Sequence, residues 1–383
     1  MRRPLKILIS AGEASGDRLG AGLARALFRL HPGVQILGMG GDEMKDAGVR
    51  LVQHASEVAV VGFVEVIEHL PTIRRAMGRL EAAVRKERPD VVVPIDFPDF
   101  NLRLAARVHP SGIPVVYYVS PQVWAWRKGR VRTMRALLRR MLVLFPFEKA
   151  FYEAEGVPAT FVGHPAAAEH PRASRVELLS RIGLDPSLRV VALLPGSRTG
   201  EVGRIFPIQL AAAKALRRDH PSLQFVVPKA RTIPAGLLQG IGASAGLPGL
   251  VTCEGEYPGI LEVADAGVVA SGTATLDAAL AGLPFVAVYK MQFLSYLIAR
   301  ALVRVDHIAL PNLVAGDRIV PELVQQECTP AAIADALGGF LVDPSRAEAL
   351  RLGLSGVRAK LCGDGAFDRA AAAVLQEAGR PPV

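Results

Sequence analysis

Two carboxylates lie in a glycine-containing loop near the start of the chain, in the segment AGEASGD (residues 11–17). The loop joins a short apolar run to an amphipathic stretch, which is where nucleotide-binding folds cradle a phosphate. It lacks the GKS or GKT ending of a P-loop and the GxGxxG spacing, and Glu13 and Asp17 would repel a bound anion. These acids suit neutral hydroxyls instead. For Asp17 a second interpretation is open, in which its side chain caps the helix that follows.

A third carboxylate ends the apolar run DVVVPID (residues 90–96). Asp96 leaves a buried strand at its carboxyl end, and burial raises the pKa of a carboxylic acid toward the range that a general base for an alcohol needs. The sequence therefore indicates Asp96 as a candidate catalytic base, with loop capping as the other interpretation. Asp99 and Asn101 lie just beyond it, and for Asp99 we favour a structural role.

Two further loops have the composition of a phosphate site, because small residues after an apolar run let backbone N–H groups approach an anion. Their residues are Gly196, Ser197 and Arg198 in one loop, and Ser271, Gly272 and Thr273 in the other. Arg198 can neutralise the charge of a leaving diphosphate. Asp277, in the first turns of the next helix, can accept hydrogen bonds from ribose hydroxyls or simply carry a favourable first-turn charge. The sequence has no Asp-x-Asp triplet to hold a metal–diphosphate complex, so no metal is expected.

Two parallel sheets are needed to position these loops. Continuous apolar runs separated by helical patterns are typical of parallel strands covered on both faces. In the first half the runs are residues 6–10, 34–40, 90–96, 114–120 and 141–147. In the second half they are residues 190–198, 223–229, 250–255, 266–272 and 284–290. We therefore expect an α/β fold of two doubly wound, Rossmann-like domains that face each other across a cleft.

The length of 383 residues agrees with two domains. The expected parts are an N-terminal domain at 1–165, a linker at 166–188, a C-terminal domain at 189–345 and C-terminal helices at 346–383. Cys253, Cys328 and Cys362 have no CxxC spacing, so neither a zinc site nor a disulfide framework is indicated. No apolar run reaches the roughly 20 residues of a membrane span, and the apolar start is too short for a secretory signal. These features predict a cytoplasmic protein.

Positive charge is concentrated in residues 100–147, which contain nine Lys and Arg and no acid within a chain of net charge +9. This basic zone predicts an anionic partner (nucleic acid, a membrane surface or a phosphorylated substrate), with a solvated helix face as the alternative. Both tryptophans, Trp124 and Trp126, adjoin it. The apolar run VAVVGFV (residues 58–64) is either core or part of an interfacial helix that enters a bilayer.

Together these motifs resemble one family, the lipid-A-disaccharide synthases, which are glycosyltransferases of the two-domain GT-B type. The matching segments run in the family's order from residue 11 to 328. They are AGEASGD, VVGFVEV, IDFPDFN, YVSPQVWAWR, FPFEKAFY, VGHP, LLPGSR, the EV pair at 201–202, ASGTATLDAAL, PNLVAG and VPELVQQEC. Two positions depart from the family pattern: Asp277 stands where Glu is usual, and Lys290 stands where Arg is frequent. The shorter acid and the loss of bidentate geometry weaken the contacts expected there.

The resemblance implies an inverting, metal-independent transfer of 2,3-diacylglucosamine from UDP-2,3-diacylglucosamine to the 6-hydroxyl of 2,3-diacylglucosamine 1-phosphate, with no cofactor. By motif match Asp96 is the base, and Glu13, Arg198 and Asn312 stand where the family has functionally required residues. The expected substrate-binding residues are Gly196, Ser197, Ser271, Gly272, Thr273, Thr275, Asp277 and Tyr289. The residues expected near the acceptor or membrane are Val60, Val61, Phe63, Trp124, Trp126, Arg127 and Arg130.

The resemblance also implies a peripheral enzyme on the cytoplasmic face of the inner membrane, bound to anionic lipids and without a nucleic-acid partner. It leaves two arrangements open for the C-terminal helices, which either pack on their own N-terminal domain or are exchanged in a homodimer.

Two alternative functions would use the same sequence features. Another UDP-GlcNAc-type enzyme of this fold, a transferase of peptidoglycan synthesis or an epimerase, would lack the combination of AGEASGD and SPQVWAW. A basic membrane- or nucleic-acid-binding protein would leave Glu13, Asp96 and both phosphate loops without a role.

Overall fold

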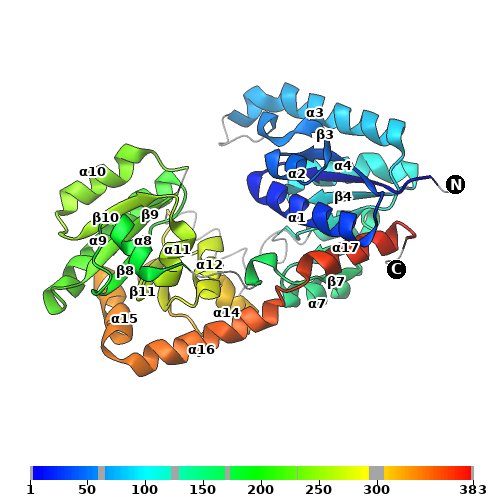
Figure 1. Cartoon of the computed structure of the whole chain (residues 1–383). Helices are drawn as coiled ribbons and strands as arrows, with labels where there is room; N and C mark the ends of the chain where they lie inside the picture. Colours follow the sequence, from blue (N-terminus) through cyan, green and yellow to red (C-terminus); the bar gives the residue numbers. More distant parts are fainter. Residues whose placement is uncertain are drawn as a thin grey trace. The chain divides into compact units, whose positions relative to one another are not determined.

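The computed structural model describes residues 3–58, 65–121, 129–168, 173–230, 232–292 and 306–380. The chain forms two compact units (Figure 1). The first unit comprises Met1–Ala168 together with Leu361–Val383, and the second comprises Glu169–Lys360. Each unit is built on one parallel sheet with helices on both faces, so the predicted α/β class with two doubly wound sheets is confirmed.

Seven parallel strands form the sheet of the first unit in the order β3-β2-β1-β4-β5-β6-β7. They are β1 (Lys6–Ala11), β2 (Gln35–Gly40), β3 (Arg50–His54), β4 (Val91–Ile95), β5 (Val116–Tyr118), β6 (Arg140–Val143) and β7 (Ala159–Phe161). The direction of winding changes between β1 and β4, which pair with Ala11 opposite Ile95. The carboxyl ends of these two strands therefore lie side by side at the switch point, where doubly wound sheets bind ligands.

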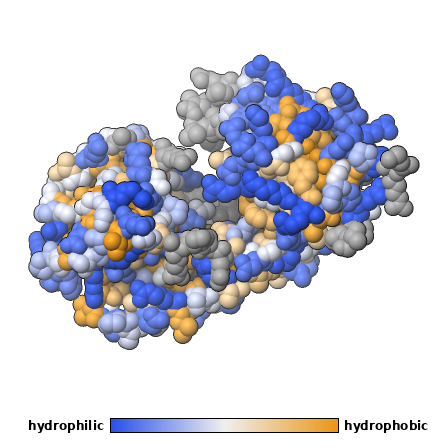
Figure 2. Space-filling model, in the orientation of Figure 1, coloured by the Kyte–Doolittle hydropathy of each residue, from blue (hydrophilic) through white to orange (hydrophobic). Residues whose placement is uncertain are grey.

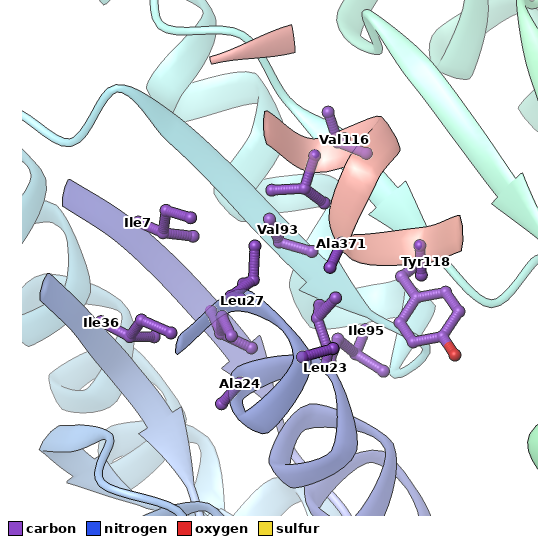
Figure 3. Packing of buried hydrophobic residues seen from close by; sticks show 14 of the residues in the cluster. Ile7, Leu23, Ala24, Leu27, Ile36, Val93, Ile95, Val116, Tyr118 and Ala371 are labelled. Atoms are coloured by element: carbon purple, nitrogen blue, oxygen red, sulfur yellow. The ribbon is translucent and has the colours of Figure 1, made fainter. Parts of the chain in front are cut away.

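Helices cover both faces of this sheet. They are α1 (Ala14–Leu30), α2 (Asp42–Asp46), α3 (Glu65–Glu87), α4 (Pro98–Val108), α6 (Gly129–Leu137), α7 (Pro146–Ala154) and α17 (Ala366–Glu377). On one face Leu23 and Leu27 of α1 and Ala371 of α17 pack against Ile7 and Val93 (Figure 3). Helices α3, α4, α6 and α7 bury their apolar side chains on the other face. Burial on both faces explains why most of these strands are continuous apolar runs.

Helix α17 brings the end of the chain back to the first unit. Its Ala370, Ala371 and Val374 are fully buried against the same face of the sheet as α1. Glu377 at its end pairs with Arg139 at 3.0 Å and with Arg140 at 2.7 Å. The C-terminal helix thus completes the core of the N-terminal unit of its own chain.

The second unit has a six-stranded parallel sheet in the order β10-β9-β8-β11-β12-β13. Its strands are β8 (Val190–Leu194), β9 (Gln224–Lys229), β10 (Leu250–Glu254), β11 (Ala266–Ala270), β12 (Phe285–Tyr289) and β13 (Glu322–Val324). Its helices are α8 (Arg175–Arg181), α9 (Thr199–Asp219), α10 (Ala235–Ala245), α11 (Tyr257–Val263), α12 (Thr273–Ala281), α14 (Leu310–Ala315), α15 (Pro330–Val342) and α16 (Pro344–Leu361), whose last residue belongs to the first unit. The switch point lies between the paired strands β8 and β11.

The segment at 166–188, expected as a linker, contains helix α8. Leu178 and Leu179 of this helix are buried in one of the two cores of the second unit.

The surfaces of both units carry hydrophilic and hydrophobic residues (Figure 2). Among the described residues, no helix combines the length and the hydropathy needed to cross a bilayer.

Candidate active site

The loop between β1 and α1 places Glu13 at the switch point of the first sheet. Glu13 is the N-cap residue of α1, but its side chain makes no capping hydrogen bond and is exposed. The loop passes close to the one after β4, because a Cβ atom on Gly12 would clash with the ring of Phe97. Glycine at this position lets the two strand-end loops meet.

Asp17 lies inside α1 and does not cap that helix. Its carboxylate is 6% exposed and accepts hydrogen bonds from the backbone N–H groups of Gly41 (2.6 Å), Glu43 (3.0 Å) and Met44 (3.1 Å). These N–H groups are at the N-terminus of α2, where a helix attracts negative charge. Asp17 therefore caps a helix, as one interpretation predicted, but the helix is α2 and not α1. Its carboxylate fixes the turn between β2 and α2.

Asp96 follows β4 directly and lies at the same switch point as Glu13. Burial, together with the nearby negative charge of Glu13, raises the pKa of Asp96 to about 6, while a hydrogen bond from the backbone of Phe97 opposes the rise. Asp96 (φ 45°) and Phe97 (φ 49°) both have left-handed backbone conformations. The carboxyl group can therefore be ionised at neutral pH and still be basic enough to take a proton from a hydroxyl.

Asn101 of α4 joins the ends of β1 and β4. Its side chain is fully buried, and its Nδ2 donates to the carbonyls of Ser10 (3.1 Å), Ile95 (3.1 Å) and Asp96 (2.8 Å). The Ser10 hydroxyl donates to its Oδ1 at 2.7 Å. The hydroxyl of Tyr117 on β5 donates to the same Asp96 carbonyl at 2.6 Å. Sequence reasoning assigned no role to Asn101 or Tyr117, because one polar residue in a helix or strand has no distinctive pattern.

Acids from elsewhere in the first unit partly neutralise the basic zone. Arg130, one of the residues expected near the acceptor or membrane, pairs with the exposed Asp99 at 2.5 Å. Arg107 pairs with Glu81, and Arg139 and Arg140 both pair with Glu377. The other residues expected near the acceptor or membrane lie outside the described residues. They are Val60, Val61, Phe63, Trp124, Trp126 and Arg127.

In the second unit, the loop after β8 turns sharply into α9. Gly196 has a φ of 112°, and a Cβ atom there would clash with the carboxylate of Glu201, which folds back over the loop. The Ser197 N–H donates to Glu201 Oε2 at 3.2 Å. Arg198 is the N-cap residue of α9 and its side chain is exposed. The loop is thus a tight turn at a helix N-terminus, which suits an anion.

Tyr289, at the end of β12, lies in the same electrostatic environment as that loop. Burial and the charge of Glu201 raise the pKa of Tyr289, while the charges of Arg198 and Arg204 lower it. The charges of Arg198, Glu201 and Arg204 therefore all act on the Tyr289 hydroxyl. Glu201 lies in the EV pair of the sequence motif, whereas no sequence signal pointed to Arg204.

The loop after β11 is held by its own hydrogen bonds. The backbone N–H of Ser271 donates to the Val288 carbonyl at 2.8 Å, and its hydroxyl donates to the Ile308 carbonyl at 3.2 Å. The buried Thr275 hydroxyl donates to the Gly272 carbonyl at 2.7 Å. Gly272 and Thr273 stay exposed at the N-terminus of α12, so their backbone can bind an anion.

Asp277 and Asn312 are both engaged with neighbouring side chains. The hydroxyl of Tyr257 donates to Asp277 Oδ2 at 3.0 Å. Asn312 is fully buried, and its Nδ2 donates to the Val320 carbonyl (2.9 Å) and to Glu322 Oε1 (2.8 Å). Its Oδ1 accepts from the backbone N–H groups of two consecutive residues, one of them Val320. The Asn312 amide is therefore used within the protein and holds the segment between α14 and β13.

Taken separately, each unit presents a distinct chemistry at its switch point. The first combines Glu13 with Asp96, which suits a hydroxylated substrate and removal of a hydroxyl proton. The second combines Arg198 with two helix N-termini, which suits a diphosphate. Across the described ranges, no group of three His, Cys, Asp or Glu side chains is arranged to hold a metal ion.

The family model and the relatives found by sequence agree on one family. The family model described as lipid-A-disaccharide synthetase matches residues 7–359. A lipid-A-disaccharide synthase of Geobacter sulfurreducens is 46% identical over 376 residues, which cover 98% of each chain. One from Syntrophus aciditrophicus is 46% identical over 370 residues, which cover 96% of this chain and 97% of the relative.

Solved structures with the same fold include two classes of enzyme. The UDP-GlcNAc 2-epimerase of Neisseria meningitidis bound to UDP-GlcNAc has a TM-score of 0.64 at 12% identity, covering 97% of this chain and 100% of that one. A glycosyltransferase of kitacinnamycin also has a TM-score of 0.64, at 19% identity, covering 98% and 100%. At these identities the likeness shows the fold alone, which is the GT-B fold expected from the sequence.

Proposed function

Because the chain belongs to the lipid-A-disaccharide synthase family and is thus a glycosyltransferase of lipid A biosynthesis, we propose its substrates and its catalytic base. The donor is UDP-2,3-diacylglucosamine and the acceptor is 2,3-diacylglucosamine 1-phosphate. The products are the β-1,6-linked disaccharide phosphate and UDP. Neither a metal ion nor a cofactor takes part.

Asp96 is the general base of this transfer. It takes the proton of the acceptor 6-hydroxyl while the hydroxyl oxygen forms a bond to the anomeric carbon of the donor. The bond from that carbon to UDP breaks, its electron pair goes to the diphosphate, and attack from the opposite side inverts the anomeric centre. The observation that carries the proposal is the carboxyl group of Asp96, whose pKa is raised to about 6 beside Glu13.

The other site residues bind the two substrates. Glu13 accepts hydrogen bonds from sugar hydroxyls, and Arg198 stabilises the charge of the departing diphosphate. The backbones of the two phosphate loops bind that diphosphate, and Asp277, held by Tyr257 at 3.0 Å, accepts from the ribose. Tyr289 contributes to the same site. Asn312 acts indirectly, by holding the segment in which it is buried.

The test is disaccharide formation by purified protein in detergent micelles containing EDTA, followed by mass spectrometry. We expect Asp96→Asn to remove almost all turnover, leaving only a trace rate, and to leave UDP affinity unchanged by calorimetry. Asp99→Asn is the matched control, since Asp99 lies nearby in the first turn of α4 but is exposed and paired with Arg130. A rate near that of the unmodified enzyme in Asp96→Asn would exclude Asp96 as the base. No product from unmodified protein that still binds UDP would exclude the acceptor.

We further propose that the enzyme binds the cytoplasmic face of the inner membrane as a peripheral protein. Replacing Val60, Val61 and Phe63 by serine should release it from vesicles of anionic lipid without unfolding it. Insolubility or loss of the thermal transition would assign these residues to the core instead. Binding to DNA as strong as to the vesicles would contradict the absence of a nucleic-acid partner.

The remaining proposal concerns the oligomer. A homodimer that exchanges C-terminal segments would place the α17–α1 contact between two copies, whereas the structure has it within one chain. Light scattering across a range of protein concentrations separates a monomer, which excludes the exchange, from a dimer, which the exchange requires. A stable dimer that separates when α17 is deleted would support the exchange.

A further inference from the structure

The backbone at Asp96 adopts a conformation that needs support. Asp96 and Phe97 both have positive φ values, of 45° and 49°. Side chains with a Cβ atom rarely adopt this region, and two such residues in succession persist only where the surroundings hold them. We propose that Tyr117 and Asn101 are positioning residues that hold Asp96 in this conformation and thereby fix the direction of its carboxylate. The inference rests on the proposed role of Asp96 as the base.

The support is two hydrogen bonds to a single carbonyl. The backbone carbonyl oxygen of Asp96 accepts hydrogen bonds from the Tyr117 hydroxyl at 2.6 Å and from Asn101 Nδ2 at 2.8 Å. A carbonyl oxygen has two lone pairs, so these donors use its full capacity. Tyr117 and Asn101 are both fully buried. If Asp96 turned to an extended conformation, its carbonyl would rotate away and leave the buried Tyr117 hydroxyl without its acceptor, which is costly.

The two donors come from different elements of the first unit. Tyr117 projects from β5 to the face of the sheet covered by α3, α4, α6 and α7, and Asn101 comes from α4. Asn101 also bonds the Ser10 carbonyl, so it connects the Asp96 turn to the strand that precedes Glu13. Asn101 therefore joins the backbone at Asp96 to the end of the strand that leads to Glu13.

Charged and titratable groups around this turn come from several elements. Asp96 is influenced by Glu13 from the loop before α1, and Tyr117 by Asp96, Asp99, Arg130 and Tyr152. Because of these neighbours, the direction of the carboxylate affects its pKa. A carboxylate that turns toward water regains hydration, so its pKa falls.

The test replaces Tyr117 by phenylalanine, which removes one donor and keeps the ring. We expect kcat to fall by about 10-fold, the effect of one lost hydrogen bond, with the KM values of both substrates and the affinity for UDP unchanged. The midpoint of the acid limb of kcat/KM should move to lower pH than in the unmodified enzyme. Asn101→Ala, which removes the other donor, should shift this midpoint in the same direction.

Tyr118→Phe is the matched control. Tyr118 is the next residue on β5, and its side chain lies on the opposite face, near Ala371 of α17 (Figure 3). Its hydroxyl is buried without a hydrogen bond among the described residues. Removing this hydroxyl should change neither kcat nor the pH profile.

A double-mutant cycle separates positioning from a general structural effect. If Tyr117 acts through Asp96, adding Tyr117→Phe to Asp96→Asn leaves the residual rate unchanged. A pH profile identical to that of the unmodified enzyme, or an equal further loss in the Asp96→Asn background, would overturn the inference while Asp96 remained the base. Full activity of Asp96→Asn alone would instead overturn the proposed function.

Discussion

Replacing Asp96 by asparagine should make the protein more stable at neutral pH while it removes activity. Burial and the charge of Glu13 raise the pKa of Asp96 from 3.8 to about 6 in the folded protein. The folded state therefore binds a proton more tightly than the unfolded state does. The stability that this provides is fully present below pH 3.8 and is lost as the pH rises through about 6. Asparagine has no charge to bury and escapes this loss.

The size of the effect follows from the two pKa values. The difference between 3.8 and about 6 corresponds to about 3 kcal/mol of unfolding free energy at pH 8. Because the side chain remains partly exposed, solvent reduces this, and we expect about 1.5 kcal/mol. For a unit of this size such a gain raises the melting temperature by roughly 3–6 °C.

Calorimetric melting of Asp96→Asn and of the unmodified protein, from pH 4 to pH 8, measures this difference. The gain should be largest at pH 8 and smallest near pH 4, where Asp96 is almost fully protonated in the folded protein. Asp99→Asn should show no gain, since Asp99 is exposed. A variant that is less stable than the unmodified protein at pH 8, or equally stabilised at pH 4, would refute the assignment of a costly buried charge.

Three other substitutions test separate parts of the site. Glu13→Gln removes a charge that raises the pKa of Asp96, so the acid limb of kcat/KM should move to lower pH. An acid limb at the same pH as in the unmodified enzyme would show that the charge of Glu13 does not raise the pKa of Asp96. Arg198→Lys keeps the charge but loses the forked donor, so the Kd for UDP should rise about 10-fold at an unchanged melting temperature; unaltered affinity would remove Arg198 from the diphosphate site. Asn312→Asp puts a second carboxyl group beside the buried Glu322 and should cost about 3 kcal/mol of stability, visible as a lower melting temperature. A melting temperature equal to that of the unmodified protein would contradict this.

The sequence predicts most strands of both sheets, and the ones it misses have a common cause. The runs beginning at residues 6, 34, 90, 114 and 141 overlap β1, β2, β4, β5 and β6. The missed strands, β3, β7 and β13, are all at sheet edges. An edge strand pairs on one side only and is less enclosed, so RLVQH at 50–54 carries polar residues that a continuous apolar pattern excludes. Periodicity therefore detects the strands at the centre of a sheet better than those at its rim.

The site was partly predictable for a similar reason. Acids and small residues at the ends of apolar strands can be read from the sequence, because strand ends meet at the switch point. The sequence could not give the contacts that hold these ends. Asn101 reaches back across two strands, and the carboxylate of Asp17 caps a helix 25 residues further on. Such contacts form only once the chain is folded, so the type of a single residue does not predict them.

The return of α17 to the first unit makes the timing of synthesis matter. The buried face of α1 is finished by Ala370, Ala371 and Val374, which the ribosome adds only after the whole of Glu169–Lys360. At a synthesis rate of about 5–20 residues per second, the N-terminal sheet lacks its last helix for on the order of 10–40 s. The second unit has no such wait, because its residues are contiguous. The first part of the chain to be synthesised is thus the last to complete its core, and α1 stays uncovered by α17 for that interval.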